Sequence, residues 1–390
     1  MKAPAQLKSA QPGGRRRCRR NDSQRRGLPR LRSMNENLPA STPARAARQP
    51  DTATLVAGVR AGDRTMLARA ITLVESRQPR HEAAAQTVLQ ELLPFTGHAK
   101  RIGITGSPGV GKSTFIETFG CQLVNRGHHV AVLTIDPSSA RSHGSILGDK
   151  TRMEKLCQSP QAFIRPSPSG EHLGGVARRT RETMLLCEAA GFDVVIVESV
   201  GVGQTEIALR SMTDFFLLLL LPGAGDELQG IKKGIVEMAD LVAINKADGD
   251  NRLRAELTRQ DQAAALHYLQ PATTGWLTEA VLCAGRDGLG VPEIWEVIEK
   301  FYRELTPRGI IERRRQQQSL AWLSDLIEDE LKQRFYRDPR VTSQLDDTRQ
   351  ALLRGEITVV KAARTLLAAA DGNPAPFPRP ATETSVTKNL

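Results

Sequence analysis

The chain has few aromatic residues: Phe, Trp and Tyr make up only 4% of its 390 residues. Surfaces that bind single-stranded nucleic acid stack bases on such rings, so this composition argues against a stacking surface of that kind. Cysteine is scarce as well. The five cysteines are scattered, with no C-x-x-C pair and no spacing typical of metal ligands. This distribution fits a reducing compartment in which the cysteines are small buried core residues.

Long apolar segments are also missing. No apolar run approaches the roughly 20 residues that span a bilayer, and the longest, residues 215–221, is typical of a buried strand. The basic residues 15–20 are not followed by the apolar stretch that a secretion signal needs. We therefore expect a cytoplasmic protein that does not enter a membrane.

The body of the chain carries no excess charge of either sign. Residues 1–50 hold 13 Lys/Arg and two Asp/Glu, which accounts for the whole formal net charge of +11. The folded part is therefore not a basic nucleic-acid binder. Residues 1–50 bury too little apolar surface to offset the entropy of ordering, and we interpret them as a disordered basic extension. The alternatives are a mitochondrial transit peptide and a translation start at Met34.

The rest of the chain divides into three regions. Residues 51–98 show helical spacing and predict a small N-terminal lobe. Residues 99–308 alternate apolar runs with amphipathic stretches, which predicts an α/β fold with a mostly parallel central sheet covered by helices on both faces. Residues 309–370 predict a helical extension with a narrow apolar stripe, which suits a partner helix in the same or another chain. Residues 371–390, with four prolines, should form a frayed tail.

Element boundaries follow from the same patterns. One helix is expected over residues 52–75 and another over 80–93. Strands are expected at residues 101–105, 129–135, 193–198, 214–221, 240–245 and 280–283. Helices are expected at residues 112–126, 175–190, 204–211, 231–238, 252–269 and 292–305.

The strongest motif is a phosphate-binding loop. It reads G-S-P-G-V-G-K-S, a full match to G-x-x-x-x-G-K-[ST], between a predicted strand and a predicted helix. Its glycines let backbone N–H groups point at phosphate oxygens, and the helix N-terminus adds the positive end of its dipole. We expect Lys112 to reach the β- and γ-phosphates and Ser113 to bind Mg²⁺. The nucleotide-binding residues expected here are Gly106, Ser107, Pro108, Gly109, Val110, Gly111, Lys112, Ser113 and Thr114.

A second motif, N-K-A-D after a buried strand, predicts which base is bound. Guanine presents the donors N1–H and N2–H₂ side by side, and an ionised carboxylate is a fork of acceptors that matches both. Adenine has no such pair, so Asp248 favours GTP over ATP. Asn245 and Lys246 complete the motif, with the Lys246 stem across the base plane. Cys283 and Ala284 stand where GTPases usually carry a loop that touches the guanine oxygen.

Two carboxylates are expected beside the phosphate-binding loop. Asp136 ends the strand H-V-A-V-L-T-I-D, and Glu198 ends D-V-V-I-V-E. The carboxyl ends of parallel strands meet at the edge where ligands bind, so both side chains can hold Mg²⁺ directly or through its waters. Gly201 would offer its N–H to the γ-phosphate. Residues 137–151 and 222–230 are either plain surface loops or switch segments that order around phosphate and metal.

Four longer strings are far more specific than the phosphate-binding loop alone: D-P-S-S-A-R-S-H-G-S-I-L-G-D-K-T-R-M, R-P-S-P-S-G-E-H-L-G-G, V-E-S-V-G-V-G-Q-T-E and P-G-A-G-D-E-L-Q-G-I-K-K-G. By these strings the chain resembles the MeaB/ArgK family of GTPases over about residues 52–340. The resemblance implies a homodimer joined by C-terminal helices. It also implies a chaperone of methylmalonyl-CoA mutase, in which GTP binding and hydrolysis gate the loading of adenosylcobalamin and protect the enzyme.

The resemblance further implies roles for single residues. The ligands of Mg²⁺ would be Ser113, Asp136, Asp149 and Glu198. Arg152 lies in the first switch, and Asp226, Gln229 and Lys232 lie in a third switch that couples nucleotide state to the mutase. A positive group there would stabilise transition-state charge as an arginine finger does, and Lys232 is the residue we expect in that role.

Some features depart from the family or leave other functions open. His143 stands where Gly is usual, Thr205 replaces Ser, and C-A-G at residues 283–285 replaces S-A-L.

A metal-insertion GTPase is one alternative function, but such a protein usually has a Cys/His cluster, whereas only His128 and His129 are adjacent here. A nucleotide-dependent kinase of a transport protein is another, although it normally uses ATP. Nucleic-acid binding through the basic extension is the last.

Overall fold

The computed structural model describes residues 51–76, 78–135, 153–167, 173–199, 205–223 and 234–372. The strands are β1 (Lys100–Gly106), β2 (Val130–Ile135), β3 (Ala162–Ser167), β4 (Val194–Ser199), β5 (Phe215–Leu220), β6 (Leu241–Ile244) and β7 (Glu279–Leu282). The α-helices are α1 (Thr52–Arg60), α2 (Arg64–Val74), α3 (Pro79–Leu92), α4 (Lys112–Asn125), α6 (Glu154–Gln158), α7 (Leu173–Ala189), α8 (Thr205–Arg210), α10 (Arg252–His267), α11 (Val291–Leu305), α12 (Ile310–Arg337), α13 (Pro339–Leu353) and α14 (Val359–Ala370). Two 3₁₀ turns are η1 (Leu93–Phe95) and η4 (Gly249–Asn251).

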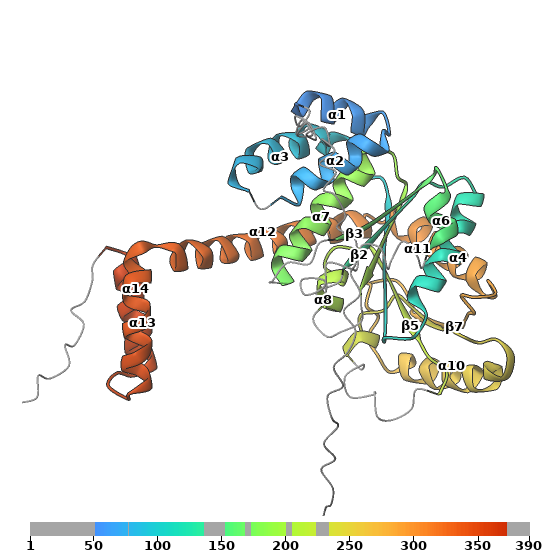
Figure 1. The fold of residues 1–390 in the computed structure, drawn as a ribbon. Coiled ribbons are helices and arrows are strands. Elements are labelled where there is room, and N and C mark those ends of the chain that lie inside the picture. The colour runs from blue at the N-terminus through green and yellow to red at the C-terminus, as the bar shows by residue number, and fades with distance from the viewer. Residues whose placement is uncertain are drawn as a thin grey trace, which may run out of the picture. The chain divides into compact units, whose positions relative to one another are not determined.

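The strands form one parallel sheet in the order β3-β2-β4-β1-β5-β6-β7. Figure 1 labels β2, β3, β5 and β7 of this sheet. The parallel order of the strands confirms the predicted fold class, an α/β fold with a parallel central sheet. Because the strands run in one direction, their carboxyl ends meet along a single edge. β1 lies between β4 and β5, so the loop that follows β1 opens at the middle of that edge, where ligands bind in such folds.

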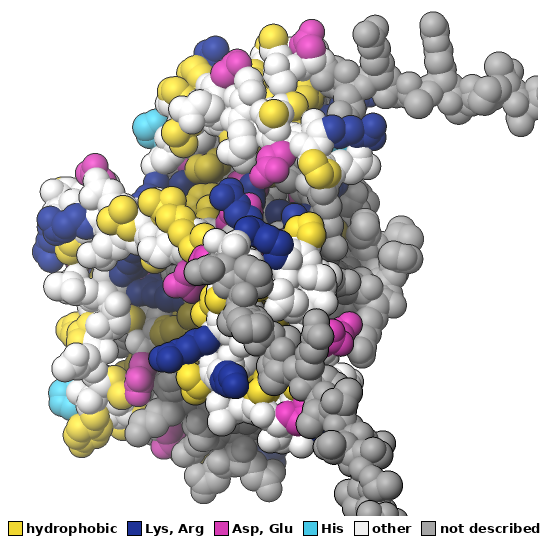
Figure 2. Space-filling view, turned by 90° about the vertical axis from the view of Figure 1, so that its left-hand side faces the viewer, with side chains coloured by type: hydrophobic (Ala, Val, Ile, Leu, Met, Phe, Trp, Pro, Cys, Tyr) yellow, Lys and Arg dark blue, Asp and Glu magenta, His cyan; other side chains and the backbone are white. Residues whose placement is uncertain are grey.

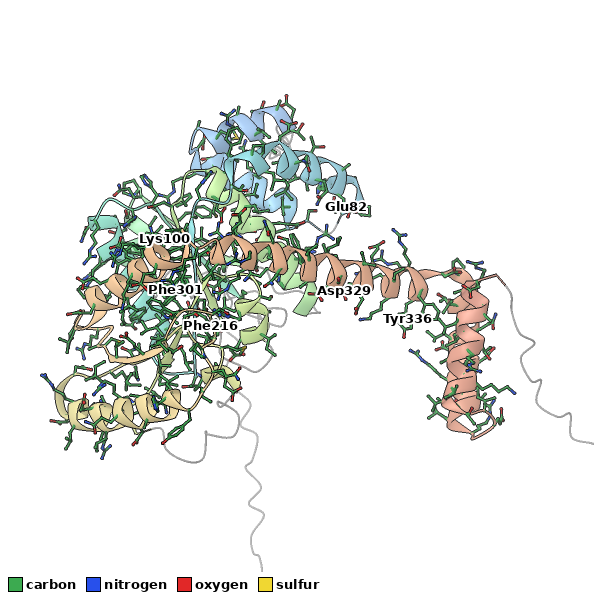
Figure 3. The ribbon with its side chains drawn as sticks, turned by 180° about the vertical axis from the view of Figure 1, so that it is seen from behind. Glu82, Lys100, Phe216, Phe301, Asp329 and Tyr336 are labelled. Atoms are coloured by element: carbon green, nitrogen blue, oxygen red, sulfur yellow. The ribbon has the colours of Figure 1, made fainter. Side chains whose placement is uncertain are left out.

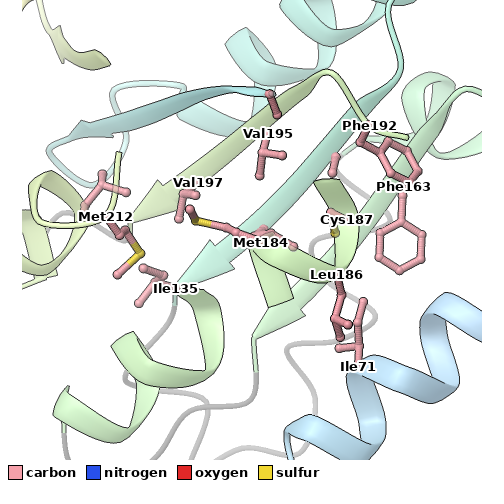
Figure 4. Packing of buried hydrophobic residues seen from close by; sticks show 14 of the residues in the cluster. Ile71, Ile135, Phe163, Met184, Leu186, Cys187, Phe192, Val195, Val197 and Met212 are labelled. Atoms are coloured by element: carbon pink, nitrogen blue, oxygen red, sulfur yellow. The ribbon is translucent and has the colours of Figure 1, made fainter. Parts of the chain in front are cut away.

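Helices cover both faces of the sheet. Alternate strand residues point to opposite faces, so every strand except β1 contributes to two apolar clusters, one on each face, while β1 contributes to one. On one face Ile104 packs in a cluster with Trp295 of α11 and with residues of α4 and α6. On the other face Val197 packs in a cluster with Met184 of α7 and Ile71 of α2, as Figure 4 shows. The functional edge is thereby carried on a core that is buried from both sides.

The expected single helix over residues 52–75 is in fact two helices, α1 and α2. Gly62 has a φ of +72°, a left-handed conformation that a glycine adopts without strain. Asp63 then caps α2, because its Oδ1 accepts hydrogen bonds from the backbone N–H groups of Thr65 at 2.7 Å and Met66 at 3.2 Å. The local turn signal therefore outweighs the helical spacing that continues across it.

Strand β3 was not predicted. It pairs with β2 from Ala162 beside Val130 to Ser167 beside Ile135, and it lies at one edge of the sheet. Its sequence A-F-I-R-P-S contains Pro166, which has no N–H for a ladder hydrogen bond. An edge strand tolerates this residue because only one of its sides is paired.

The C-terminal helices leave apolar side chains exposed. α12 is one unbroken helix of 28 residues whose first turn is buried at Ile311. Farther along, four side chains at helical spacing are between 50% and 66% exposed, and we name them the α12 stripe: Leu320, Leu323, Ile327 and Leu331. α13 and α14 pack against each other around Ala351 and Ala362. The α12 stripe is thus available to a partner.

The surface carries mixed charge. On the face shown in Figure 2, basic, acidic and hydrophobic side chains are interspersed. This agrees with the balanced charge of the chain beyond residue 50. Within the residues described, no helix is long and apolar enough to cross a membrane.

Candidate functional site

The loop between β1 and α4 has the backbone that a phosphate cradle needs. Gly106 has a φ of +154°, and a Cβ on it would lie 2.4 Å from the carbonyl oxygen of Leu219 in the neighbouring strand β5. Gly111 has a φ of +95° just before α4 begins, and a Cβ there would lie 2.9 Å from Nδ2 of Asn245. Both positions therefore require glycine, and the loop is held tightly between β5 and the residues that follow β6.

Lys112 turns back into this loop. Its side chain is 8% exposed, and Nζ donates hydrogen bonds to the carbonyl oxygens of Gly106 at 2.8 Å and Ser107 at 3.4 Å. Burial lowers the pKa of the Lys112 ammonium, and the carboxylates of Glu198 and Glu206 oppose that shift. A cation is thereby held inside a ring of backbone groups, where an anionic phosphate would meet it.

Ser113 and Glu198 lie together beside the loop. The Ser113 hydroxyl donates to Oε1 of Glu198 at 3.3 Å, and Glu198 is 5% exposed near the end of β4. A hydroxyl and a carboxylate are oxygen donors of the kind that Mg²⁺ prefers. Within the residues described, no group of three or more His, Cys, Asp or Glu side chains could hold a metal. These two residues fit part of a magnesium site, to which a nucleotide would add phosphate oxygens.

The N-K-A-D motif directly follows β6, as predicted, and Asn245 joins three loops. Asn245 is 2% exposed, and its Nδ2 donates to the carbonyl oxygen of Val110 in the phosphate-binding loop at 2.8 Å. Its Oδ1 accepts from the N–H of Gly285 at 2.9 Å and from Sγ of Cys283 at 3.6 Å. One amide therefore fixes the phosphate-binding loop, its own turn and the loop after β7 relative to one another.

The two charged residues of this turn are more exposed than Asn245. Lys246 is exposed, with a φ of +61°, the one positive value that a non-glycine residue has in the described part of the chain. Asp248 is half-buried. The N–H of Ala247 between them donates to the carbonyl oxygen of Cys283 at 3.0 Å, so the turn is tied to the loop after β7. Strained backbone of this kind is maintained where the surrounding structure determines it.

Cys283 lies against the same turn, where it bonds to Asn245 and Ala247. Its side chain is fully buried, and burial raises the pKa of the thiol to about 12. At neutral pH it is therefore a neutral S–H, which suits its contact with the Asn245 carbonyl oxygen. The next residues, Ala284 and Gly285, close against α4, since a Cβ on Gly285 would lie 2.8 Å from Cα of Phe115. The loop thus lies directly against the first turn of α4.

Glu206 is a buried carboxylate that the motifs did not single out. It is 2% exposed in the first turn of α8 and accepts a hydrogen bond from the Thr205 hydroxyl at 3.2 Å. Leu209, one turn later on the same face of α8, is fully buried. In the sequence, Glu206 stands out only as the last residue of the string V-E-S-V-G-V-G-Q-T-E, which does not indicate its burial.

The structure brings together many of the predicted site residues, and others lie outside the residues that it describes. Close to one another are the phosphate-binding loop with Lys112 and Ser113, Glu198, Asn245, Cys283 and Ala284. Outside the described residues lie Asp136, Asp149, Arg152, Gly201, Gln229 and Lys232, together with His143 and Asp226. The roles expected for those residues stay predictions.

Comparison with known proteins gives consistent results. The model of the family described as methylmalonyl Co-A mutase-associated GTPase MeaB matches residues 67–340. A putative GTPase of Caulobacter vibrioides is 55% identical over 309 residues, which are 79% of this chain and 94% of that protein. GTPase ArgK of Escherichia coli is 50% identical over 273 residues, which are 70% of this chain and 82% of that protein.

A eukaryotic relative and a solved structure extend the similarity. The mouse protein named methylmalonic aciduria type A homolog, mitochondrial, is 42% identical over 325 residues, covering 81% of this chain and 78% of that protein. The crystal structure of LAO/AO transport system kinase superposes with a TM-score of 0.67 at 39% identity, covering 82% of this chain and 97% of that one.

Proposed function

Because this chain belongs to the MeaB family of GTPases, we propose that it hydrolyses GTP at the site around Lys112 and Asp248 and thereby serves a cobalamin-dependent mutase. The observation that carries the proposal is the Asn245 amide, which joins the phosphate-binding loop to the turn that presents Asp248. Phosphate and base subsites are thus held at a fixed separation. A nucleotide that matched only one subsite would lose the other.

Each end of the nucleotide has a chemical match. The triphosphate lies on the N–H groups of the loop and the Lys112 ammonium, and guanine N1–H and N2–H₂ meet the Asp248 carboxylate. The stem of Lys246 covers the base, and the loop at Cys283 and Ala284 lies against the guanine oxygen. Adenine offers an acceptor at N1 and would leave the carboxylate unsatisfied.

Magnesium is the proposed metal. Ser113 and Glu198 fit it by their oxygen donors, and Asp136 and Asp149 complete the proposed ligand set. When bound, the ion neutralises charge on the phosphate oxygens. Lys112 stabilises the same charge from inside the loop, while Gly201 binds the γ-phosphate. Arg152, Gln229 and Lys232 are the further catalytic residues we propose, with Lys232 supplying positive charge in the transition state.

The proposed partner is methylmalonyl-CoA mutase. Support comes from the description of the family and from the mouse relative named after methylmalonic aciduria. GTP binding and hydrolysis would gate the loading of adenosylcobalamin onto the mutase and protect the loaded enzyme. The proposal places the protein in the cytoplasm.

We further propose a homodimer. The α12 stripe supports it, because four large apolar side chains at helical spacing are at least half exposed. The corresponding domain division is a helical lobe at residues 51–98, the GTPase domain at 99–308 and a dimerisation region at 309–370. Residues 1–50 and 371–390 are the proposed extensions.

The test is phosphate release from GTP by the purified chain, with and without methylmalonyl-CoA mutase. We expect slow turnover alone and faster turnover with the mutase, and a complex on gel filtration. If the mutase neither accelerates hydrolysis nor binds, the chaperone role is wrong. Transfer of label from γ-labelled nucleotide to a protein would instead support a kinase, the activity in the name of the solved relative.

A further inference from the structure

One row of residues crosses four strands just before their carboxyl ends. Ile104 of β1 lies beside Glu198 of β4, Glu198 lies beside Thr134 of β2, and Thr134 lies beside Pro166 of β3. Ile104 and Pro166 are apolar, so the two polar members of the row are direct neighbours. Neighbouring strands lie about 4.8 Å apart. Thr134 is therefore one strand away from a carboxylate that fits the magnesium site.

Thr134 and Glu198 also share a face of the sheet. Val132 and Ile196 precede them by two residues, and both belong to the apolar cluster on the face that α4 covers. Because side chains alternate between the two faces along a strand, Thr134 and Glu198 lie on that face as well. Figure 3 labels Phe301 of α11, which packs in the same cluster. The hydroxyl and the carboxylate are thus on the same side of the sheet.

The hydroxyl of Thr134 is buried without a partner. The residue is 4% exposed, and its Oγ1 has no hydrogen bond to any of the residues described. A buried hydroxyl without a partner costs free energy, whereas valine has the same shape and would avoid that cost. Packing of the sheet alone would therefore favour valine at this position and does not explain the hydroxyl.

The neighbouring carboxylate can accept a further donor. Glu198 is 5% exposed, and its Oε1 accepts from the hydroxyl of Ser113 at 3.3 Å. This bond is long, because O–H donors usually lie about 2.7–2.8 Å from their acceptors, so it does not fix the carboxylate by itself. An ionised carboxylate has about four acceptor positions. On the side of β2, the row offers Thr134 as the donor.

We propose that Thr134 is a positioning residue of the magnesium site, whose hydroxyl donates to the Glu198 carboxylate when metal and nucleotide are bound. Carboxylates at metal sites are themselves held by hydrogen bonds, and loss of such a partner typically lowers metal affinity about 10- to 100-fold. Because the hydroxyl makes no such bond in the structure described here, its contribution arises on loading. This inference rests on the proposed GTPase function and adds a residue to its metal site.

The experiment compares the wild-type full chain with Thr134→Val. Guanosine β,γ-imidotriphosphate is titrated calorimetrically at a series of Mg²⁺ concentrations and in EDTA. The midpoint of the Mg²⁺ dependence should rise about 10- to 100-fold in the variant. Affinity in EDTA should not change, because Lys112 and Asp248 are untouched. The free energy of unfolding of the metal-free chain in urea should be equal or higher, because valine removes a buried hydroxyl that lacks a partner.

Two further variants separate this role from general effects of the substitution. Thr183→Val makes the same change at another buried hydroxyl without a partner, in α7 on the opposite face of the sheet, and should leave the Mg²⁺ midpoint unchanged. Thr134→Ser keeps the hydroxyl and should keep the midpoint near the wild-type value.

Three results would overturn the role of Thr134. The first is an unchanged Mg²⁺ midpoint in Thr134→Val. The second is an equal shift in Thr134→Ser or in Thr183→Val, because the hydroxyl at this place would then not be responsible. The third is a metal-free Thr134→Val chain that is less stable than the wild type or does not fold, which would make the hydroxyl a structural group.

Failure of the proposed function would look different. A wild-type chain that binds no guanine nucleotide, or binds it with no dependence on Mg²⁺, would refute the proposed site itself and the role of Thr134 with it. A wild-type chain that responds to Mg²⁺ while Thr134→Val responds equally would refute the role of Thr134 alone.

Discussion

Replacing Asp248 with Asn should change the base that the protein selects. The carboxylate accepts two hydrogen bonds from guanine, whereas the amide presents one acceptor and one donor, so one guanine donor would meet another donor. A hydrogen bond to a charged group contributes about 1.5–3 kcal/mol, and a buried unsatisfied donor costs about 1–3 kcal/mol. Because Asp248 is only half-buried, we expect the binding free energy of GDP to weaken by about 3–4 kcal/mol. This corresponds to a loss of GDP affinity on the order of 10²- to 10³-fold.

The Asp248→Asn chain should bind xanthine nucleotides more tightly than the wild-type chain does. Xanthine carries an oxygen where guanine has the N2 amino group, so the Asn amide could donate to that oxygen and accept from N1–H. The fold should not change, because Asp248 makes no side-chain cap to the following 3₁₀ turn. The assay is calorimetric titration of the Asp248→Asn chain with GDP and xanthosine diphosphate.

Asp250→Asn is the matched control, since it removes the same charge from an exposed residue of the same turn. Its GDP affinity should stay within about 2-fold of the wild type, because exposed charges interact weakly through water. Unchanged GDP affinity in Asp248→Asn, or no gain for xanthosine diphosphate, would refute the assignment of Asp248 to the base.

Three further predictions follow from buried groups. Asn245→Ala should lower the free energy of unfolding in urea titrations by about 2–4 kcal/mol, because it leaves buried backbone groups in two loops without hydrogen-bond partners. The control Asn251→Ala, at an exposed residue, should change that free energy by less than about 0.5 kcal/mol. Arg315→Ala should cost about 3–5 kcal/mol by leaving a buried aspartate unpaired, against at most about 1 kcal/mol for the exposed pair broken by Arg349→Ala. The pKa of Cys283 is about 12 in the folded chain, so alkylation at pH 8 should spare this thiol until the protein unfolds, as mass spectrometry would show. Because the thiol loses its proton at lower pH in the unfolded chain, the free energy of unfolding should fall as pH rises from about 9 to 12, as pH-dependent melts would show.

Local signals made much of the fold predictable. The phosphate-binding loop was placed correctly because its glycines and the flanking strand and helix are consecutive in the sequence. The turn at Gly62 and Asp63 was also local, yet it was overlooked because apolar spacing continues through it. Strand β3 was missed for another reason: an edge strand that contains Pro166 has neither the apolar run nor the propensity of a central strand.

Contacts between distant residues were beyond such reasoning. Asp214 and Arg315 are separated by 101 residues, yet they form a buried pair. Asn245 was predicted as part of the guanine motif, but its bond to Val110 of the phosphate-binding loop spans 135 residues. Nothing in the sequence indicated that the side chain of Gln318 in α12 donates to the carbonyl oxygen of Arg210 at the end of α8. Pairings of this kind follow from the register of the sheet and the paths of the helices, which only the three-dimensional structure gives.

The most direct test of the account is calorimetric titration of the purified full-length chain with GDP and with ADP in the presence of Mg²⁺. The account predicts that GDP binds at one site and that ADP binds on the order of 10²-fold more weakly or worse, because adenine leaves the Asp248 carboxylate without its donors. Equal affinity for the two nucleotides, or binding of neither, would contradict it.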